Sequence, residues 1–366
     1  MRLEILEVQG FRNLQGTIAC GDGLNILIGD NGQGKTNWLE AIFVLAAARS
    51  FRTARLVEAV SFNGELAIIR GDVRQSAEIV HSLQIAISGN TRTINVNGKK
   101  ETLQRYLAEL YAVVFNADEL EIVRGHPEAR RRFLDGGITS IYPPYLQTLT
   151  DYNKVIRQKA SLLQSSAEQQ LSEEKLRQLL EPWNQQLITL AARIYRARVR
   201  FVERLNQVLE NRLFGGEEIS IRYLSSLEGK GDLNDYEGLL SERLKLRVQA
   251  ELAAGHSLIG THRDDLEIAL DGHDLRKYGS AGQQRSALLL LQIANLTVFH
   301  SQRGEYPLFL LDDVDSELDY KRIGQLLEFL RGKTQTFITT SKKDLVDKFG
   351  SGASVFHVEK GAAKMG

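Results

Sequence analysis

Three observations predict an α/β fold with an inserted, mainly helical second lobe. A glycine-rich loop at residues 29–36 follows an apolar run and precedes a helical pattern. Near the other end of the chain, a second apolar run at residues 308–311 ends in two adjacent aspartates. From about Asp118 the hydrophobic period changes from two residues to 3.6, which indicates long helices between the two apolar runs.

The loop at residues 29–36 reads GDNGQGKT, which matches the phosphate-binding pattern G-x4-G-K-[ST]. Its glycines let successive backbone N–H groups turn inward around phosphates, and the N-terminus of the next helix favours an anion. Lys35 supplies a positive charge to the β- and γ-phosphates, and Thr36 offers its hydroxyl to Mg²⁺. The loop therefore predicts a nucleoside triphosphate site. The alternative is an ordinary glycine-rich turn before a helix.

Composition indicates an ordinary globular protein. The chain has 366 residues, 43% of them hydrophobic and 25% charged, which is enough for two packing units. The formal net charge is +0, so any contact with nucleic acid must come from local basic patches. The single cysteine, Cys20, excludes an internal disulfide framework and a cysteine-rich zinc site, and it suits a small buried hydrophobe. We expect neither a signal peptide nor a membrane span, and a cytoplasmic protein.

Residues 1–120 are expected to form the amino-terminal part of the first lobe. The pattern predicts strands at residues 1–9 and 17–20, and alternating apolar residues predict an antiparallel sheet at residues 67–73, 83–87 and 93–96. Asn97-Gly98 offers a hairpin turn, and residues 111–115 form a further apolar strand. Arg12 lies close to the phosphate loop in sequence order, so it is either a nucleotide contact or a solvated turn arginine.

Residues 121–300 are expected to form the helical lobe. Amphipathic stretches at residues 144–164 and 172–214 predict helices, and Pro182 suits the first turn of a fresh helix, so the second stretch predicts two helices. Gly215 and Gly216 are expected to end this run. A further helix is predicted at residues 237–254, and a second sheet at residues 266–270.

One face of the long helical stretch carries a basic stripe, formed by Arg193, Arg196, Arg200 and Arg204. The spacing of three to four residues places these side chains on one side of a helix. A charged stripe is usually a solvated face. The alternative is a DNA-binding surface that follows the phosphate backbone.

Two further motifs complete the predicted site. A glycine-serine turn at Gly279 and Ser280 opens a helix and is a second candidate anion site. In residues 301–366, expected to be the carboxy-terminal part of the first lobe, Asp312 is the candidate to hold Mg²⁺ through water. Asp313 is the candidate to orient or deprotonate the attacking water. The hydroxyls at the end of the next strand, residues 336–340, are placed to reach the γ-phosphate.

The order of these motifs resembles that of an ABC-type P-loop ATPase head. A phosphate loop is followed by a helical insertion, a serine-glycine-glutamine turn, an acidic strand and then residues 316–319, which read SELD. In such proteins the signature turn of one subunit caps the γ-phosphate that the loop of another subunit holds. The resemblance therefore implies an ATP-dependent homodimer with two nucleotides at its interface.

Five short motifs make the resemblance more specific, because each is similar to one in the RecF family: Phe11-Arg12-Asn13, residues 130–135 (RRRFLD), residues 262–265 (HRDD), residues 282–285 (GQQR) and residues 311–314 (LDDV). This family of bacterial recombination mediators resembles SMC head domains without the long coiled coil. The resemblance implies ATP-dependent dimerisation on DNA at single-strand gaps, slow DNA-stimulated hydrolysis, work with RecR and RecO, and help in loading RecA.

The resemblance also assigns roles to single residues. It implies that Lys35 and Thr36 belong to the Walker A motif and that Ser280 and Gly282 belong to the signature motif. It likewise implies that Asp312 and Asp313 are the Walker B acids and that Asp319 is the D-loop acid. Thr340 falls where transporter ATPases carry a switch histidine. The expected catalytic residues are Asp313, Lys35 and Ser280, and the expected metal-binding residues are Thr36 and Asp312. The expected nucleotide contacts are Arg12, Gly29, Asn31, Gly32, Gly34, Lys35, Thr36, Asn37, Ser280, Gly282, Gln283, Asp319 and Thr340.

The chain departs from the family pattern in three places. Thr261 stands in place of a proline, Asp315 in place of an aromatic residue, and Ser341-Lys342 in place of a threonine-aspartate ending. Two motifs also have structural alternatives. His262 is either a structural histidine or a residue near the nucleotide or dimer interface. Arg130, Arg131 and Arg132 form either a salt-bridged helix start or a contact with DNA or a partner subunit.

Two other functions remain open at this stage. The chain could be a nucleotide-switched DNA clamp in which hydrolysis is incidental, or an ABC-type ATPase subunit of another system. The Asp-Asp pair and the basic helical lobe argue against a transporter subunit. The length of the chain argues against a full SMC protein with its long heptad repeats.

Overall fold

The computed structural model describes residues 1–75, 79–168, 172–211 and 218–366, which fall into two compact units. Among these residues, the first unit contains 1–123 and 279–366, and the second contains 124–211 and 218–278. The two ends of the chain therefore build one unit together. This division differs from the expected boundaries at residues 120 and 300, because it places the helix that follows Ser280 in the first unit.

An antiparallel sheet in the first unit has the strand order β2-β1-β4-β5-β6-β7. Its strands are β1 (Arg2–Phe11), β2 (Leu14–Ala19), β4 (Leu66–Arg74), β5 (Val80–Ser88), β6 (Thr91–Val96) and β7 (Lys99–Lys100). Buried residues alternate along β4, as in a sheet with one face on the core. Asn97 and Gly98, with φ of 50° and 74°, form the turn between β6 and β7 that the sequence predicts.

The second sheet of this unit has the order β15-β14-β3-β13-β12-β8. Its strands are β3 (Leu24–Ile28), β8 (Ala112–Phe115), β12 (Leu308–Leu311), β13 (Thr336–Thr340), β14 (Ser354–Glu359) and β15 (Ala362–Met365). All neighbours pair in parallel except β14 and β15. Every residue of β12 and β13 is buried, as expected where both faces of a parallel sheet are covered.

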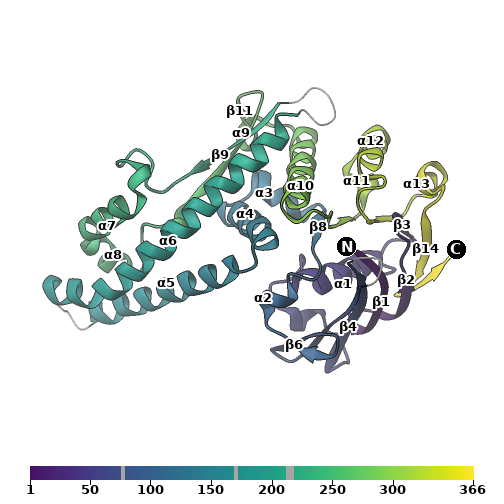
Figure 1. The fold of residues 1–366 in the computed structure, drawn as a ribbon, viewed down its shortest axis with the longest axis horizontal. Coiled ribbons are helices and arrows are strands. Elements are labelled where there is room, and N and C mark those ends of the chain that lie inside the picture. The colour runs from purple at the N-terminus through teal and green to yellow at the C-terminus, as the bar shows by residue number, and fades with distance from the viewer. Residues whose placement is uncertain (76–78, 169–171, 212–217) are drawn as a thin grey trace. The chain divides into compact units, whose positions relative to one another are not determined.

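Helix α1 (Lys35–Ala47) contacts strands of both sheets and joins their cores (Figure 1). Trp38, Leu39 and Ile42 of this helix are fully buried and belong to one apolar cluster with side chains of both sheets. The other helices of the unit are α2 (Leu103–Tyr106), α10 (Ala281–Arg303), α11 (Val314–Glu317), α12 (Tyr320–Leu330) and α13 (Lys343–Phe349).

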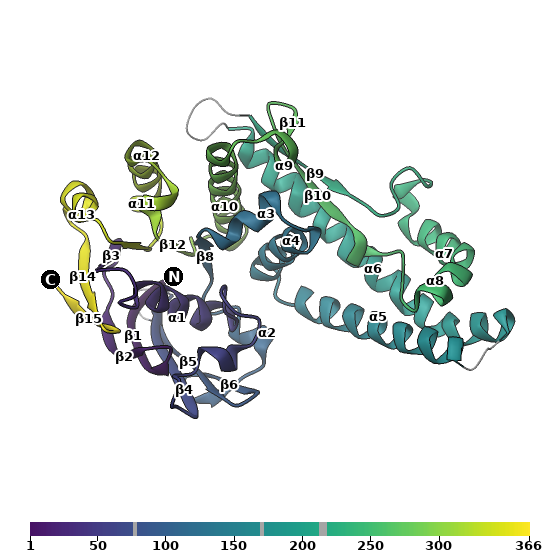
Figure 2. The ribbon, with the colours of Figure 1, turned by 180° about the vertical axis from the view of Figure 1, so that it is seen from behind.

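The second unit is mainly helical. Its helices are α4 (Pro127–Ile141), α5 (Tyr145–Glu168), α6 (Glu173–Leu209), α7 (Tyr236–Leu246), α8 (Val248–Ala254) and α9 (Leu275–Tyr278), and the short α3 (Glu121–Arg124) leads into it. Three strands form its antiparallel sheet: β9 (Ile219–Leu224), β10 (Asp265–Leu270) and β11 (His273–Asp274). Strand β9 contacts α6 and runs beside it in both views (Figures 1 and 2).

The prediction that a new helix begins at Pro182 is wrong, because α6 is one helix of 37 residues with Pro182 inside it. Proline removes one backbone hydrogen bond from a helix interior and costs about 3 kcal/mol there. Leu180 and Leu187, on either side of the proline, are both fully buried, while Pro182 is exposed. Packing of this apolar face keeps the helix continuous.

The prediction of a single helix at residues 237–254 is also wrong in part. The structure has two helices there, α7 and α8, separated at Arg247, whose φ of −105° and ψ of 5° are not helical. Leu244 and Val248 are both buried on the two sides of this break. Gly255, with φ of 68°, ends α8 as predicted, whereas Gly215 and Gly216 lie outside the described residues. In the part of the chain that the structure describes, no helix has the length and apolar character required to cross a bilayer.

Candidate functional site

The loop between β3 and α1 has the backbone of a phosphate-binding loop. Gly32 and Gly34 adopt φ of 80° and 108°, a region that favours glycine. Gly29 is required for a different reason, because a Cβ there would lie 2.3 Å from the carbonyl oxygen of Val358. Asn31 is exposed within the loop, so it is open to solvent or ligand.

Lys35 folds back over this loop. Its Nζ donates to the carbonyl oxygens of Gly29 at 2.8 Å and Asp30 at 2.9 Å, and the residue is only 8% exposed. Among the described residues, the ammonium group is therefore held beside the loop by two backbone carbonyl oxygens. A compact point charge in this place can bind phosphate oxygens.

Asp312 is the meeting point of three chain segments. Its Oδ1 accepts hydrogen bonds from Thr36 Oγ1 at 2.9 Å and from Thr339 Oγ1 at 2.7 Å. Burial raises the pKa of Asp312, and the two hydroxyl groups oppose this rise. A carboxylate and a threonine hydroxyl within hydrogen-bond distance are hard oxygen donors, which fit Mg²⁺. The predicted metal residues, Thr36 and Asp312, are thus in direct contact.

Asp313 begins α11 with a positive φ of 48°, which is strained for a residue other than glycine. Its backbone N donates to Thr339 Oγ1 at 2.7 Å, and its carboxylate accepts a hydrogen bond from Ser316 Oγ. Unlike Asp312, Asp313 is exposed. The two aspartates therefore differ in environment, one mostly buried and one open to solvent.

The structure separates the roles of Thr339 and Thr340. Thr340 is fully buried, and its hydroxyl accepts a hydrogen bond from the backbone N of Lys342 at 3.0 Å. Its carbonyl oxygen accepts from Gly29 N at 3.4 Å. Thr339, one of the hydroxyls expected at the end of this strand but not among the named site residues, is the threonine that contacts both aspartates. Neighbouring residues of a strand point to opposite faces, so only one of them can do so.

Arg12 binds a buried carboxylate that the sequence did not single out, Glu40 of α1. The Arg12 guanidinium donates to both oxygens of Glu40, at 2.7 Å and 3.0 Å, and Glu40 is fully buried. Arg52 donates to Asn37 Oδ1 at 2.7 Å, and Asn37 in turn donates to Asn13 at 2.7 Å. The turn after β1 is thereby fastened to the first turns of α1.

The signature turn forms a complete capping box at the start of α10. Ser280 Oγ accepts from Gln283 N, and the Gln283 side chain accepts from Ser280 N at 2.8 Å. Ser280 and Gly282 are exposed. No hydrogen bond or ion pair among the described residues joins this turn to the Lys35 loop. Asp319 has a similar local role, because its carboxylate caps α12 by accepting from Arg322 N at 2.8 Å.

The basic stripe lies on α6 in the second unit. Arg193, Arg196 and Arg200 are exposed and Arg204 is half-buried. Arg196 is paired with Glu237 at 2.7 Å, whereas none of the ion pairs among the described residues involves the other three. The charge of the stripe is thus only partly neutralised within the chain.

The remaining arginine and histidine motifs form a buried network in the second unit. Arg130 binds both oxygens of Asp265, at 2.6 Å and 3.0 Å, and Arg131 donates to the carbonyl oxygen of Asp264 at 2.7 Å. His262 contacts Tyr152 through Nδ1 at 2.8 Å, and burial lowers its pKa to about 4. These contacts favour the structural alternative for Arg130 and His262, while Arg132 is exposed.

Comparison with known proteins agrees with this geometry. The family model described as the RecF/RecN/SMC N terminal domain matches residues 2–364. A DNA replication and repair protein RecF from Staphylococcus aureus (strain bovine RF122 / ET3-1) is 35% identical over 371 residues, which cover 99% of each chain. The chain belongs to the RecF family.

Solved structures support the same assignment. The structure of a recombination mediator protein RecF-ATP in the RecFOR pathway is 33% identical, with a TM-score of 0.90 over 99% of this chain and 97% of that one. An Smc head bound to the C-terminal winged-helix domain of ScpA has a TM-score of 0.55 at 14% identity, so it shows likeness of fold alone. The fold is therefore the ABC-type ATPase head that RecF and SMC proteins share, as the sequence predicts.

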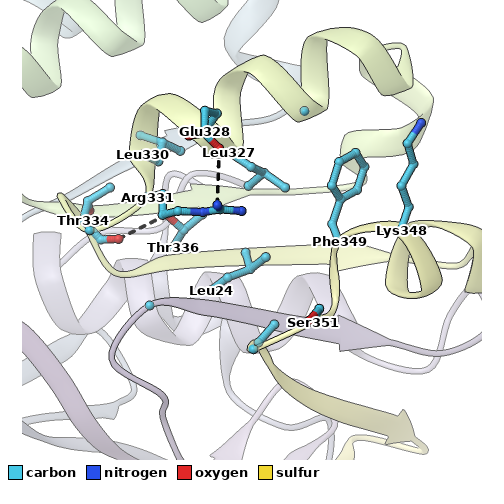
Figure 3. Close-up of a pocket in the computed structure, with 15 residues that line it drawn as sticks. Leu24, Leu327, Glu328, Leu330, Arg331, Thr334, Thr336, Lys348, Phe349 and Ser351 are labelled. Atoms are coloured by element: carbon cyan, nitrogen blue, oxygen red, sulfur yellow. Dashed lines mark hydrogen bonds and ion pairs between the residues drawn. The ribbon is translucent and has the colours of Figure 1, made fainter.

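A pocket of about 350 Å³ lies elsewhere in this RecF-family chain (Figure 3). It is lined by Leu24 and Thr336, which begin β3 and β13, by Arg331 just after α12, and by Phe349 of α13. The phosphate loop lies at the opposite ends of these strands. None of the named site residues lines this pocket, and two of its lining residues, Arg331 and Glu328, form an ion pair at 3.5 Å (Figure 3).

Proposed function

We propose that this chain is an ATPase of recombinational repair. It binds ATP with Mg²⁺, dimerises on ATP at gapped DNA, and assists RecA loading together with RecO and RecR. The observation that carries the proposal is the junction at Asp312, where hydroxyls from α1 and β13 meet the carboxylate that ends β12. The relatives support the pathway, since one of the similar solved structures is a RecF-ATP complex in the RecFOR pathway.

The chain's own residues suggest how hydrolysis proceeds. Lys35 leaves the loop carbonyls to neutralise the β- and γ-phosphates, and Thr36 and Asp312 hold the metal ion. When bound, Mg²⁺ stabilises the negative charge that develops on the phosphate oxygens. Asp313 is exposed, so it can orient a water molecule and accept its proton as the water oxygen attacks the γ-phosphorus. The bond from that phosphorus to the β-phosphate bridging oxygen breaks, releasing ADP and phosphate.

The signature turn is proposed to act on the nucleotide of a second chain. Ser280 and Gly282 are exposed at the N-terminus of the long helix α10, where backbone N–H groups and the helix dipole favour an anion. A γ-phosphate cage that needs two chains would form only in the dimer. This links ATP binding to dimerisation.

Sedimentation with and without ATP tests the proposal. Ser280→Arg should bind ATP through Lys35 and Thr36 yet remain monomeric and inactive. Asp313→Asn should dimerise with ATP and persist as a dimer, because the cage forms while the water is poorly activated. A Ser280→Arg protein that dimerises like wild type would contradict action of the signature turn on a second chain. Retention on DNA without single-turnover hydrolysis in the wild type would favour a nucleotide-switched clamp.

A further inference from the structure

Asp315 and Lys342 form an ion pair with each other. Lys342 Nζ lies 3.4 Å from Asp315 Oδ2 and donates to the carbonyl oxygen of Asp315 at 3.2 Å. The Asp315 side chain is 3% exposed and that of Lys342 is 52% exposed. A nearly buried carboxylate is thus matched by an ammonium group that reaches it from the surface.

Asp315 depends on this one partner. The Oδ1 atom of Asp315 is buried and has no hydrogen bond with any described residue. The ion pair between its Oδ2 atom and Lys342 is therefore the interaction that compensates the charge of this carboxylate. A buried charge left without its partner is costly. A solvated lysine left without its partner costs little. The pair is therefore asymmetric.

The pair lies between the groups that the proposed hydrolysis uses. Asp315 is on α11, two residues after Asp313 and four before Asp319. Lys342 follows β13, and its backbone N is bound to Thr340. Thr339 of the same strand is bound to both Asp312 and Asp313. The end of β13 is thus fastened to the start of α11 by threonine hydroxyls and to its middle by Lys342.

Helix α11 is also held from its other end. Arg285 of α10 donates through Nε to Glu317 at 2.8 Å, and the Glu317 side chain is 11% exposed. A short helix of four residues has little stability of its own, so its position is set by such side-chain contacts. Lys342 and Arg285 therefore act together with Thr339 and the buried Val314 to fix the position of α11 between Asp313 and Asp319.

We propose that Asp315 and Lys342 are positioning residues, which hold α11 against the end of β13 and so place Asp313 for water activation. The inference rests on the proposed ATPase function. It predicts that breaking the pair lowers the rate of the chemical step without weakening nucleotide binding, because the hydrogen bonds and ion pairs of the two residues among the described part of the chain go to each other and to Thr340, and not to the phosphate loop.

The test compares Lys342→Met, Lys342→Arg, Asp315→Asn and the double variant Asp315→Asn/Lys342→Met. Lys342→Met should lower kcat for ATP about tenfold while the Kd for a fluorescent ATP analogue changes by less than about twofold. Lys342→Arg should keep most of the wild-type kcat. Arg331→Met, which breaks the exposed pair with Glu328, is the matched control and should behave as wild type.

Thermal unfolding supplies a readout that does not depend on activity. Lys342→Met should lower Tm more than Asp315→Asn, and the double variant should recover part of that loss, because it removes the unpaired buried carboxylate. A Lys342→Met protein with wild-type kcat would overturn the positioning role. A wild-type protein that neither binds nor hydrolyses ATP would instead contradict the proposed function.

Discussion

Arg12 and Glu40 form a two-point ion pair, with the guanidinium nitrogens 2.7 Å and 3.0 Å from the two carboxylate oxygens. Glu40 is fully buried and also accepts a hydrogen bond from Ser50 at 2.6 Å. The pair joins the turn after β1 to the helix that follows the phosphate loop. The pair therefore stabilises the position of the helix that follows the phosphate loop, independently of any contact between Arg12 and a nucleotide.

Replacing Arg12 with methionine should be destabilising, because it leaves the buried Glu40 carboxylate with only the Ser50 hydroxyl and the more distant Arg52 guanidinium, at 3.4 Å, among the described residues. We expect a loss of about 3 kcal/mol in the free energy of unfolding of the first unit. Urea titration followed by the fluorescence of Trp38, in a Trp183→Phe background, reports on that unit. Arg2→Met, which breaks an exposed pair with Asp22, is the control and should cost less than about 0.5 kcal/mol. Equal losses in the two variants would contradict the buried-pair argument.

Lys35→Arg tests the loop. The bulkier guanidinium fork cannot occupy the small space beside the Gly29 and Asp30 carbonyl oxygens without displacing phosphates. Hydrolysis should fall at least about tenfold, a transition-state loss of about 1.4 kcal/mol or more. Steady-state phosphate release measures the effect, with Lys333→Arg as a control on the surface. Unchanged turnover in the purified Lys35→Arg protein would remove Lys35 from the site.

If the basic stripe on α6 binds DNA phosphates, its arginines should contribute to the salt dependence of DNA binding. Alanine at Arg193, Arg200 or Arg204 should weaken binding similarly across sequences and reduce the slope of log K against log salt by about one. Arg196→Ala should have a smaller effect, because Glu237 already neutralises that charge. Arg157→Ala on α5 is the control. Fluorescence anisotropy over a salt series measures these slopes. Slopes equal to that of the wild type would indicate that the stripe is an ordinary solvated face.

Acid should destabilise the second unit through His262. Burial lowers the pKa of His262 from its ordinary 6.5 to about 4, so the neutral ring is favoured in the folded state. The neutral ring contributes fully to the free energy of unfolding above pH 6.5. This contribution is lost as the pH falls toward 4, by up to about 1.4 kcal/mol per pH unit. His262→Gln should flatten the pH dependence of unfolding, followed by Trp183 fluorescence in a Trp38→Phe background, whereas exposed His256→Gln should not. Parallel curves for wild type and His262→Gln would contradict this.

Much of the fold could be predicted because its determinants are local. The phosphate loop, the apolar strands around it and the Asn97-Gly98 hairpin depend on residues that are close together in the sequence. The continuity of α6 through Pro182 could not be predicted, since it depends on leucines that are buried only when α6 packs in the folded unit. Tertiary packing overrides local propensity there.

The site was predictable where a residue type and its spacing define a role, as for Lys35, Thr36 and Asp312. Contacts between distant segments were not. The sequence suggests hydroxyls at the end of β13, yet only the structure shows that Thr339 and not Thr340 faces the aspartates. Glu40 reads as one more polar residue of a helix, and its burial beside Arg12 becomes visible only when β1 and α1 are assembled.

The position of β3 has a consequence for synthesis of the chain on the ribosome. This strand carries the phosphate loop near the start of the sequence, but both of its neighbours, β13 and β14, are made last. The parallel sheet cannot close until almost the whole polypeptide has emerged, whereas the helical unit is contiguous enough to form earlier. Closing such a long loop is slow, and the unpaired edges of β3 are exposed meanwhile. A truncated nascent chain would therefore contain a folded helical unit and no competent nucleotide site.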